Sequence, residues 1–409
     1  MKRSSRLSTD PAFILLLAFL FLIDVSIAAC YVLATVILLL FLLHLLRGGP
    51  FPPLPLFCWF FLAYVFFTLL ATVFSLDPGA SFRDNKELLI FLLLPIYIWL
   101  LDSWKRVRLS LGTVLAAGAF SALAGIFAVA GKGIAAGVVL SDRLKGFTSH
   151  WMTYSGLLML PFIFFAVRVM LRRGERKHTA MTVTALGLML AAIAFSLTRN
   201  VWLGIALALG LFFVFFKPKY FLVLAPLLLV LVLLAPPAVR SRAFSIVDLQ
   251  DSSNRDRIYM VYSGLKIFQD RPWTGVGSHN IQKVILGDER RYRHPQAERV
   301  NLHLHNNFLQ ILAERGIFAL ASFILACLSI LLQLARRLKA QAGEQRAVTA
   351  GVLFAFIGFL AAGMFEYNFG DSEIKFLLFY FISLPFLTPV QAGLDGVRGE
   401  EHVQAQESL

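Results

Sequence analysis

The stretch ACYVLATVILLLFLLHLL, residues 29–46, decides the fold class of this chain. It contains no carboxylate, lysine or arginine, and it approaches the length of about 20 apolar residues that a helix needs to cross the hydrocarbon core of a bilayer. The rest of the chain is similar: 58% of its 409 residues are hydrophobic and 15% are charged. Soluble domains carry about 25% charged residues. The sequence therefore predicts an all-α polytopic membrane protein.

Apolar segments of comparable length recur along the chain. We expect about 12 transmembrane helices in a single membrane domain covering residues 1–409, with a tight turn near Asp24 to Ser26 between the first two. The predicted spans are 12–28, 29–46, 56–76, 86–101, 109–131, 152–171, 179–197, 199–216, 219–237, 316–335, 347–366 and 372–389.

Basic residues mark one side of this predicted membrane domain. Short connections such as RGGPFPPLP, DSWKRVR and RRLKAQAGEQR are basic, whereas connections on the opposite side, such as DPGASFRDN, hold few lysines or arginines. Basic short loops remain in the cytoplasm, so both termini are predicted to be cytoplasmic. The net charge of +14 is thereby explained without a nucleic acid as partner.

One long segment, residues 238–315, departs from this pattern and is predicted to form a periplasmic loop. Long loops do not determine orientation, so its basic residues leave the topology unchanged. A cationic outer loop suits membrane lipid headgroups or a phosphorylated substrate, with a solvated basic surface as the alternative. The lysines and arginines between 238 and 304 are Arg240, Arg242, Arg255, Arg257, Lys266, Arg271, Lys283, Arg290, Arg291, Arg293 and Arg299.

The predicted spans contain almost no ionisable residue near the bilayer centre. Asp24 lies at a turn, and Glu366, Glu373 and Lys375 lie close to the predicted outer surface. Ion and proton pathways need such residues inside the membrane. A secondary transporter or an exporter is therefore disfavoured, and the chemistry is expected at the outer face. The three cysteines indicate neither a disulfide framework nor a thiolate metal site.

Two predicted outer segments place cations at the membrane edge. SDRLKGFTSHWMTYSG, residues 141–156, puts Arg143, Lys145 and His150 just before a span. FSLTRNVWLG, residues 195–204, puts Arg199 between two spans with almost no loop around it. An arginine this close to hydrocarbon is costly unless it is paired or faces a water-filled cavity. Arg199 is therefore a candidate functional residue, with snorkelling to lipid headgroups as the alternative.

The long loop contains a predicted amphipathic helix at residues 257–269. The RPWTGVG sequence that follows predicts a turn, with glycines where the backbone bends or is approached closely. Its Gly-Val-Gly is not a nucleotide-binding fingerprint, because no strand precedes it and no βαβ unit surrounds it. The apolar face predicted by helical spacing consists of Ile258, Val261, Tyr262, Leu265 and Phe268.

The stretch NLHLHNNFLQILAERG, residues 301–316, places histidines at the start of an apolar helix. His305, Leu309, Leu312 and Gly316 fall on one helical face, so His305 is expected in the first turn. A helix N-terminus and neighbouring arginines both disfavour an imidazolium. We therefore expect a neutral His305 that can act as a general base, with a helix-capping histidine as the alternative.

A metal site is not expected at these histidines. His303 and His305 are two residues apart, and on a helix they would point in different directions. His279 and His294 are further candidates, but no carboxylate spacing supports a complete ligand set. The sequence also lacks an Asp-x-Asp pair of the kind that bridges a metal to a nucleotide-sugar. No metal and no other cofactor is predicted.

Taken together, these segments resemble the O-antigen ligase family, within the wider O-antigen ligase/polymerase superfamily. One position departs from the family pattern: Val261 stands where members often have an aromatic residue, so Arg255 could share or replace the role of Arg257. The matching motifs are, in order, Ser196-Leu197-Thr198-Arg199, Arg257, Pro272-Trp273-Thr274-Gly275-Val276-Gly277, and His305-Asn306-Asn307-Phe308-Leu309 running on to Glu314 and Gly316.

The resemblance implies a GT-C-like glycosyltransferase of the Gram-negative inner membrane, active at the periplasmic face in lipopolysaccharide biosynthesis. The donor would be a polysaccharide on undecaprenyl pyrophosphate, and the acceptor would be a sugar hydroxyl of lipid A-core. Such a reaction would proceed by inverting single displacement without metal or ATP.

The resemblance also implies roles for individual residues. His305 would be the general base, and Arg199 and Arg257 would stabilise the pyrophosphate leaving group. The residues expected to contact substrate are Arg143, Lys145, Arg255, Tyr262 and Asn306, and those expected to shape the backbone are Pro272, Gly275, Gly277 and Gly316.

Other functions remain open at this point. An O-antigen polymerase would use the same donor with a second lipid-linked glycan as acceptor, and a protein O-oligosaccharyltransferase would use a serine or threonine. The oligosaccharyltransferases tend to carry an extra C-terminal region, which is not expected here. A lipid-linked glycan flippase and a non-catalytic scaffold are the alternatives from other classes.

Overall fold

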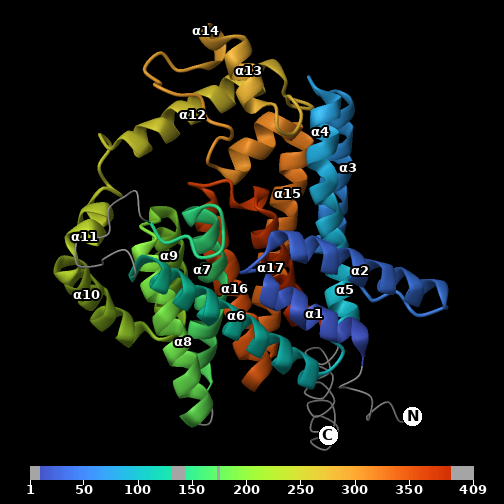
Figure 1. Cartoon of the computed structure of the whole chain (residues 1–409), viewed down its shortest axis with the longest axis vertical. Coiled ribbons are helices and arrows are strands. Elements are labelled where there is room, and N and C mark those ends of the chain that lie inside the picture. The colour runs from blue at the N-terminus through green and yellow to red at the C-terminus, as the bar shows by residue number, and fades with distance from the viewer. Residues whose placement is uncertain (1–9, 131–142, 173–175, 388–409) are drawn as a thin grey trace, which may run out of the picture.

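The computed structural model describes residues 10–130, 143–172 and 176–387, and these residues form helices with no β-strand among them (Figure 1). The predicted all-α fold class is confirmed. In chain order the helices are α1 (Pro11–Leu22), α2 (Ile27–Leu46), α3 (Phe57–Val73), α4 (Pro78–Asp84), η1 (Asn85–Leu92), α5 (Leu93–Leu100), α6 (Trp104–Ala130), α7 (Trp151–Leu171), α8 (Arg176–Phe195), α9 (Arg199–Phe216), α10 (Pro218–Leu234), α11 (Pro237–Phe244), α12 (Ser252–Asp270), α13 (Ile281–Gly287), α14 (Glu289–Tyr292), α15 (Asn307–Ala340), α16 (Gly343–Gly363), η4 (Asn368–Gly370), α17 (Ser372–Ser383) and η5 (Leu384–Phe386).

Seven of the described helices are long and apolar enough to cross a membrane: α2, α6, α7, α8, α9, α15 and α16. Helices α1 and α3 are apolar but shorter. The turn predicted between the first two apolar segments is present, because α1 ends at Leu22 and the Ser26 side chain caps α2. The chain is a multi-pass membrane protein. The predicted cytoplasmic termini belong to residues 1–9 and 388–409, which lie outside the described residues.

Five of the 12 predicted spans do not coincide with a described helix long enough to cross a membrane, so that number is not confirmed. Two of them, 12–28 and 56–76, lie in the shorter α1 and α3. The other three are divided or shortened. The segment 86–101 is divided between η1 and α5, 219–237 lies mostly in the 17-residue α10, and 372–389 contains the 12-residue α17 followed by η5. A proline lacks the N–H that continues a helix and crowds the preceding turn. Each of these segments contains one, namely Pro95, Pro226 and Pro385.

The centre of the bundle is formed by α7 and α16. Helix α7 is buried along most of its length, and α16 packs against both α7 and α9. The backbones of α9 and α16 approach closely at Gly204 and Gly358, where a Cβ on Gly204 would lie 2.7 Å from the Gly358 carbonyl oxygen. Small residues at such crossings let two membrane helices gain close van der Waals contact.

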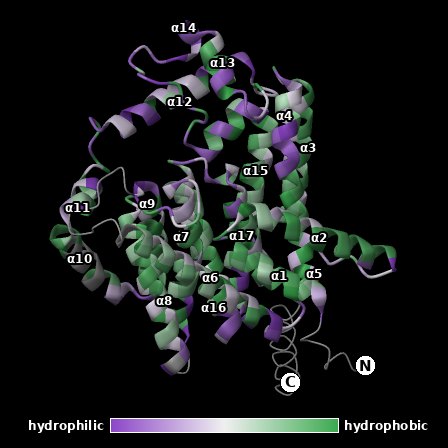
Figure 2. Cartoon of the chain, viewed as in Figure 1, coloured by the Kyte–Doolittle hydropathy of each residue, from purple (hydrophilic) through white to green (hydrophobic). Residues whose placement is uncertain are grey.

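Helices α11 to α14 and their connections, residues 236–306, form a separate layer over one end of the bundle, here called the polar layer (Figure 1). Figure 2 shows frequent hydrophilic residues along α12 and α14, in contrast to the mostly hydrophobic α2. The layer has a small apolar core of its own, which also includes side chains from the start of α15. Its members are Met260, Ile267, Val276, Ile281, Val284, Ile285, Leu304, Leu309 and Ala313.

The polar layer is joined to α15 where the Pro-Trp-Thr-Gly-Val-Gly turn meets Gly316. The Val276 N–H donates to the Ala313 carbonyl at 3.0 Å, and the Ile317 N–H donates to the Pro272 carbonyl at 2.9 Å. Gly316 has φ 77° and interrupts the helical geometry of α15. A side chain there would collide with the Trp273 backbone, so the predicted turn and this glycine form one interlocked unit.

The helix predicted at 257–269 lies within α12, but its predicted buried face is wrong. Ile258, Val261 and Leu265 are 54%, 43% and 45% exposed. The buried side holds Met260, Ser263, Gly264 and Ile267 instead. A Cβ on Gly264 would lie 2.7 Å from Leu309 Cγ, so α12 packs too closely against the start of α15 for large side chains. The buried face of α12 is therefore the one with small residues, which allow the close approach to α15. Hydrophobic periodicity does not detect such a face.

Candidate functional site

His305 forms a hydrogen-bonded pair with Glu366. The His305 Nδ1 and Glu366 Oε2 atoms are 2.8 Å apart, and the Glu366 side chain is buried. The expectation that His305 occupies the first helical turn is wrong: α15 begins at Asn307, Asn306 is its N-cap, and His305 precedes the cap with φ 47°. The reason is that the Asn306 side chain accepts the Leu309 N–H at 2.9 Å, which starts the helix after the histidine.

The segment after α16 is tied to the start of α15 by asparagine side chains. Asn306 Nδ2 donates to the Met364 carbonyl at 2.9 Å, and Asn307 Oδ1 accepts the Phe369 N–H at 2.9 Å. These bonds hold Glu366 opposite His305. Asn306 was expected to contact substrate, and here its oxygen and nitrogen are both engaged within the chain.

Electrostatics keep Glu366 ionised. Burial by itself would raise the pKa of this carboxyl, but the hydrogen bond from His305 and the further interactions of the carboxylate with His305, His303 and Arg257 outweigh burial and lower the pKa. An ionised Glu366 accepts the Nδ1 proton of His305, which leaves the lone pair of a neutral imidazole on Nε2. The tautomer is therefore determined by Glu366.

Two further histidines lie near Glu366. Burial lowers the pKa of His303 to about 4, and burial also lowers the pKa of His150. His150 caps α7, because its Nδ1 accepts the Met152 N–H at 3.2 Å, and it stacks on Trp151. His303 lies beside His305, with ring centroids 4.2 Å apart. His303 and His305 thus lie beside one carboxylate, and the charge of Glu366 also acts on His150.

Arg199 lies at the start of α9 with its side chain 5% exposed, and it holds the connection between α11 and α12. Its Nη1 donates to the Ser245 carbonyl at 2.7 Å and to Ser245 Oγ at 2.9 Å, while Nη2 pairs with Asp251 Oδ1 at 3.0 Å. Asp251 is also the N-cap of α12 and lies 3.7 Å from Arg242 Nη1. Arg199 is therefore paired, as its position at the membrane edge required.

Arg257 joins α12 to the segment that carries Glu366. Its Nε donates to the Phe365 carbonyl at 3.0 Å, and its Nη1 donates to Ser253 Oγ at 2.8 Å. Arg255 is exposed, so of the two arginines considered from the sequence it is Arg257 that faces His305 and Glu366.

Arg143 differs from Arg199 and Arg242 in having no ion pair with a carboxylate among the described residues. Its guanidinium lies over the Trp151 ring at 4.8 Å, and its buried Nε has no hydrogen-bond partner there. Burial and the charge of Arg199 both lower the pKa of Arg143. Burial, together with Arg199 and Arg143, lowers the pKa of Arg242 to about 10.

These four guanidinium groups, from Arg143, Arg199, Arg242 and Arg257, form an arginine cluster. The carboxylates that act on it, within the part of the chain that the structure describes, are Asp251, Glu366 and Asp256. The excess of positive charge in a partly buried site favours an anionic ligand. The sequence analysis identified three of these four arginines as candidates. It did not single out Arg242, which belongs to no motif and is one of many basic residues in the long loop. Glu366 was noticed only as a charge near the outer surface, although its position just past an apolar span was a usable signal.

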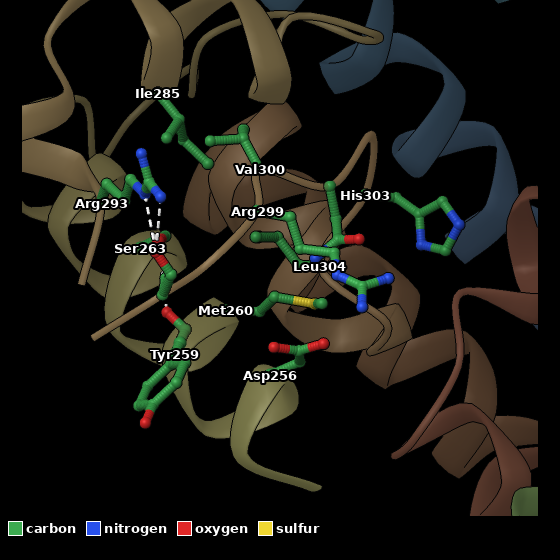
Figure 3. Close-up of a pocket in the computed structure, with 12 residues that line it drawn as sticks. Asp256, Tyr259, Met260, Ser263, Ile285, Arg293, Arg299, Val300, His303 and Leu304 are labelled. Atoms are coloured by element: carbon green, nitrogen blue, oxygen red, sulfur yellow. Dashed lines mark hydrogen bonds between the residues drawn. The ribbon is translucent and has the colours of Figure 1, made fainter. Parts of the chain in front are cut away.

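Two expected substrate residues lie elsewhere. Lys145 is exposed, and Tyr262 contacts the His294 ring and Lys266. Beside Tyr259 is a small pocket between α12 and the segment after α14 (Figure 3). Figure 3 shows Asp256, Tyr259 and Met260 on one side, with Arg299 and His303 on the other. His303 lines this pocket and also contacts His305.

Residues 184–324 match the family model described as "O-Antigen ligase". The resemblance to the O-antigen ligase family is confirmed. The matched segment includes Arg199, Arg242, Arg257, the 272–277 turn and His305, whereas Arg143 and Glu366 lie outside it and reach the site through the fold.

A curated relative supports the same family. A Rickettsia conorii (strain ATCC VR-613 / Malish 7) protein named "Putative polysaccharide ligase RC0486" is 27% identical over 211 residues. The match covers 50% of this chain and 49% of the relative, so this chain matches about half the length of that protein.

Proposed function

We propose that this protein is an O-antigen ligase that transfers a polysaccharide from undecaprenyl pyrophosphate to a sugar hydroxyl of lipid A-core. The observation that carries the proposal is the His305–Glu366 pair beside an arginine cluster with excess positive charge. A base that activates a hydroxyl and cations that receive a diphosphate are the two requirements of this reaction. The family match supports the same assignment.

His305 acts as the general base. Glu366 holds the proton on Nδ1, so Nε2 accepts the proton of the attacking hydroxyl. The hydroxyl oxygen forms a bond to the anomeric carbon of the donor as the bond from that carbon to the phosphate oxygen breaks. The bonding electrons leave with undecaprenyl pyrophosphate, and one displacement inverts the configuration at the anomeric carbon.

The arginine cluster binds the pyrophosphate and offsets the charge that develops as it leaves. Arg143 is the first candidate for direct contact, because its guanidinium is not committed to a carboxylate within the described residues. Arg199 and Arg257 use part of their donor capacity on Ser245, Asp251 and Phe365. They retain further N–H groups for phosphate oxygens. Neither a metal ion nor ATP is required for this step.

The proposed orientation places the polar layer and the arginine cluster at the periplasmic face of the Gram-negative inner membrane. Both substrates carry lipid tails that stay in the bilayer, so the site has to be reached from the membrane edge. Arg199 at the start of the apolar α9 and His150 at the N-terminus of the apolar α7 both lie at helix ends, which supports an approach from the membrane edge.

Transfer in a purified system tests the proposal. The full chain is combined with undecaprenyl-pyrophosphate glycan and lipid A-core in the presence of EDTA and without ATP. We expect glycan on lipid A-core with the native protein and none with His305→Ala. Longer lipid-linked glycan with lipid A-core untouched would identify a polymerase. The absence of any transfer by a folded native protein would overturn the proposal.

A further inference from the structure

Three potential metal ligands surround one point of the candidate site. One nitrogen of His303, one nitrogen of His305 and one carboxylate oxygen of Glu366 all lie within 4.8 Å of one another. The sequence argument against a metal assumed that a helix would separate the two histidines. Because α15 begins only at Asn307, residues 301–306 are not helical and both rings turn toward Glu366.

We propose that His303, His305 and Glu366 bind a divalent zinc ion, and that this zinc inhibits the enzyme. Two imidazoles and a carboxylate, with a fourth position open to water, are a common zinc ligand set. Ligand atoms on a tetrahedral zinc with bonds of about 2.0–2.1 Å lie about 3.3 Å apart. Here Glu366 Oε2 lies 2.8 Å from His305 Nδ1, and Glu366 Oε1 lies 3.7 Å from His303 Nδ1. Side-chain shifts would bring one carboxylate oxygen and the two nitrogens to tetrahedral spacing.

The histidine that the reaction does not use supplies independent support. His303 Nδ1 is buried and has no hydrogen-bond partner among the described residues. A buried nitrogen without a partner is costly to keep unless something else satisfies it. This nitrogen lies 3.7 Å from Glu366 Oε1, so a cation bound to Glu366 would also reach His303 Nδ1.

Zinc is expected to inhibit because it binds Nδ1 of His305. This expectation of inhibition rests on the proposed function, in which His305 is the general base. Zinc on Nδ1 of His305 displaces the proton from that atom and leaves a proton on Nε2. The lone pair that accepts the proton of the attacking hydroxyl is then lost. Arg257 adds positive charge near Glu366, and this charge repels a cation at the site. We therefore expect the protein to bind zinc with micromolar affinity and EDTA to reverse the inhibition.

Metal binding to the full chain in detergent is measured first, using protein without a histidine tag and after EDTA treatment. Cobalt(II) absorption and zinc calorimetry are recorded for the native protein, His303→Gln and Glu366→Gln. His294→Gln is the matched control, because His294 also lies in the polar layer but stacks on Tyr259 and is not one of the three proposed zinc ligands. We expect one zinc per native chain, at least tenfold weaker binding in the first two variants, and no change in the control.

The transfer assay is then repeated with added zinc. We expect zinc to inhibit the native protein and His294→Gln, whereas His303→Gln transfers glycan without zinc and keeps its activity when zinc is added. Equal zinc affinity in the native protein and His303→Gln, or activation by zinc, would overturn the inference. If no protein transfers glycan, the proposed function fails while the cobalt and zinc titrations still decide whether the metal site exists.

Discussion

Helices α7 and α16 meet through apolar and small side chains, whereas α12, the segment before α15 and the segment after α16 meet through hydrogen bonds and ion pairs. The two regions respond differently to mutation. In the bundle core the cost of a change is set by volume, because lipid offers apolar contacts as good as those of another helix. In the polar layer the cost of a mutation is set by the charge that it leaves unpaired. Mutations there should abolish the reaction while the protein still folds.

The strongest way to test this contrast is His305→Ala. We expect glycan transfer to fall by about 10³-fold, since a positioned general base contributes about 10²–10⁴-fold. The thermal midpoint should fall only modestly, because the imidazole is partly exposed and outside the helix, and Arg257 stays near the Glu366 carboxylate. Transfer kinetics and a thermal melt of the same preparation check both parts. Substantial residual transfer would remove the base assignment.

Arg143→Gln separates charge that binds substrate from charge that supports the fold. Transfer should fall by about 10²-fold with little loss of stability, because Arg143 pairs with no carboxylate among the described residues. Arg199→Gln is the comparison: it should lower both transfer and the thermal midpoint, since it leaves Asp251 without its closest partner. If the two variants lose stability equally, Arg143 has a structural role.

Glu366→Gln should reduce transfer by about 10–100-fold, the usual cost of losing a group that orients a functional histidine. A neutral amide no longer favours the proton on Nδ1 of His305. Steady-state measurement should show the loss mainly in kcat, with KM for the donor nearly unchanged. A loss confined to KM would place Glu366 in substrate binding instead.

In the bundle core, Gly204→Ala should lower stability by about 1–3 kcal/mol while the remaining folded protein stays active. The added Cβ would lie 2.7 Å from the Gly358 carbonyl oxygen, so α9 and α16 must separate. Gly187→Ala in α8 is the matched control, because nothing lies within 4 Å of its Cβ. Thermal melts in detergent compare the two. Equal stability would mean that α9 and α16 do not pack at this crossing.

The smallest effect is expected from pH at Asp371, the N-cap of α17. Burial, followed by the charges of Glu366 and Glu373, raises the pKa of this carboxyl to about 8, from 3.8 in an exposed group. The folded state therefore binds more protons than the unfolded state between these values, so the stability contributed by this group falls as pH rises. Asp371→Asn should flatten the decline in thermal midpoint between about pH 4 and pH 8. An unchanged slope would contradict the raised pKa.

The sequence alone predicted much of the site and missed specific parts for identifiable reasons. Arg199, Arg257 and His305 were found because each belongs to a motif or lies at a costly position. Glu366 follows His305 by 61 residues and joins it only through contacts of Asn306 and Asn307 with the segment after α16. The buried face of α12 was mispredicted because Gly264 gives no hydrophobic signal.

The sequence by itself determined that this is a multi-pass α-helical membrane protein, because apolar runs must satisfy their backbone hydrogen bonds within each helix. It also determined where the polar segments lie along the chain. Only the tertiary structure decided which charges meet: Glu366 with His305, Asp251 with Arg199, and Arg143 with no carboxylate among the described residues. Coulombic and hydrogen-bond energies depend on distances between segments far apart in the chain, and local pattern does not contain those distances.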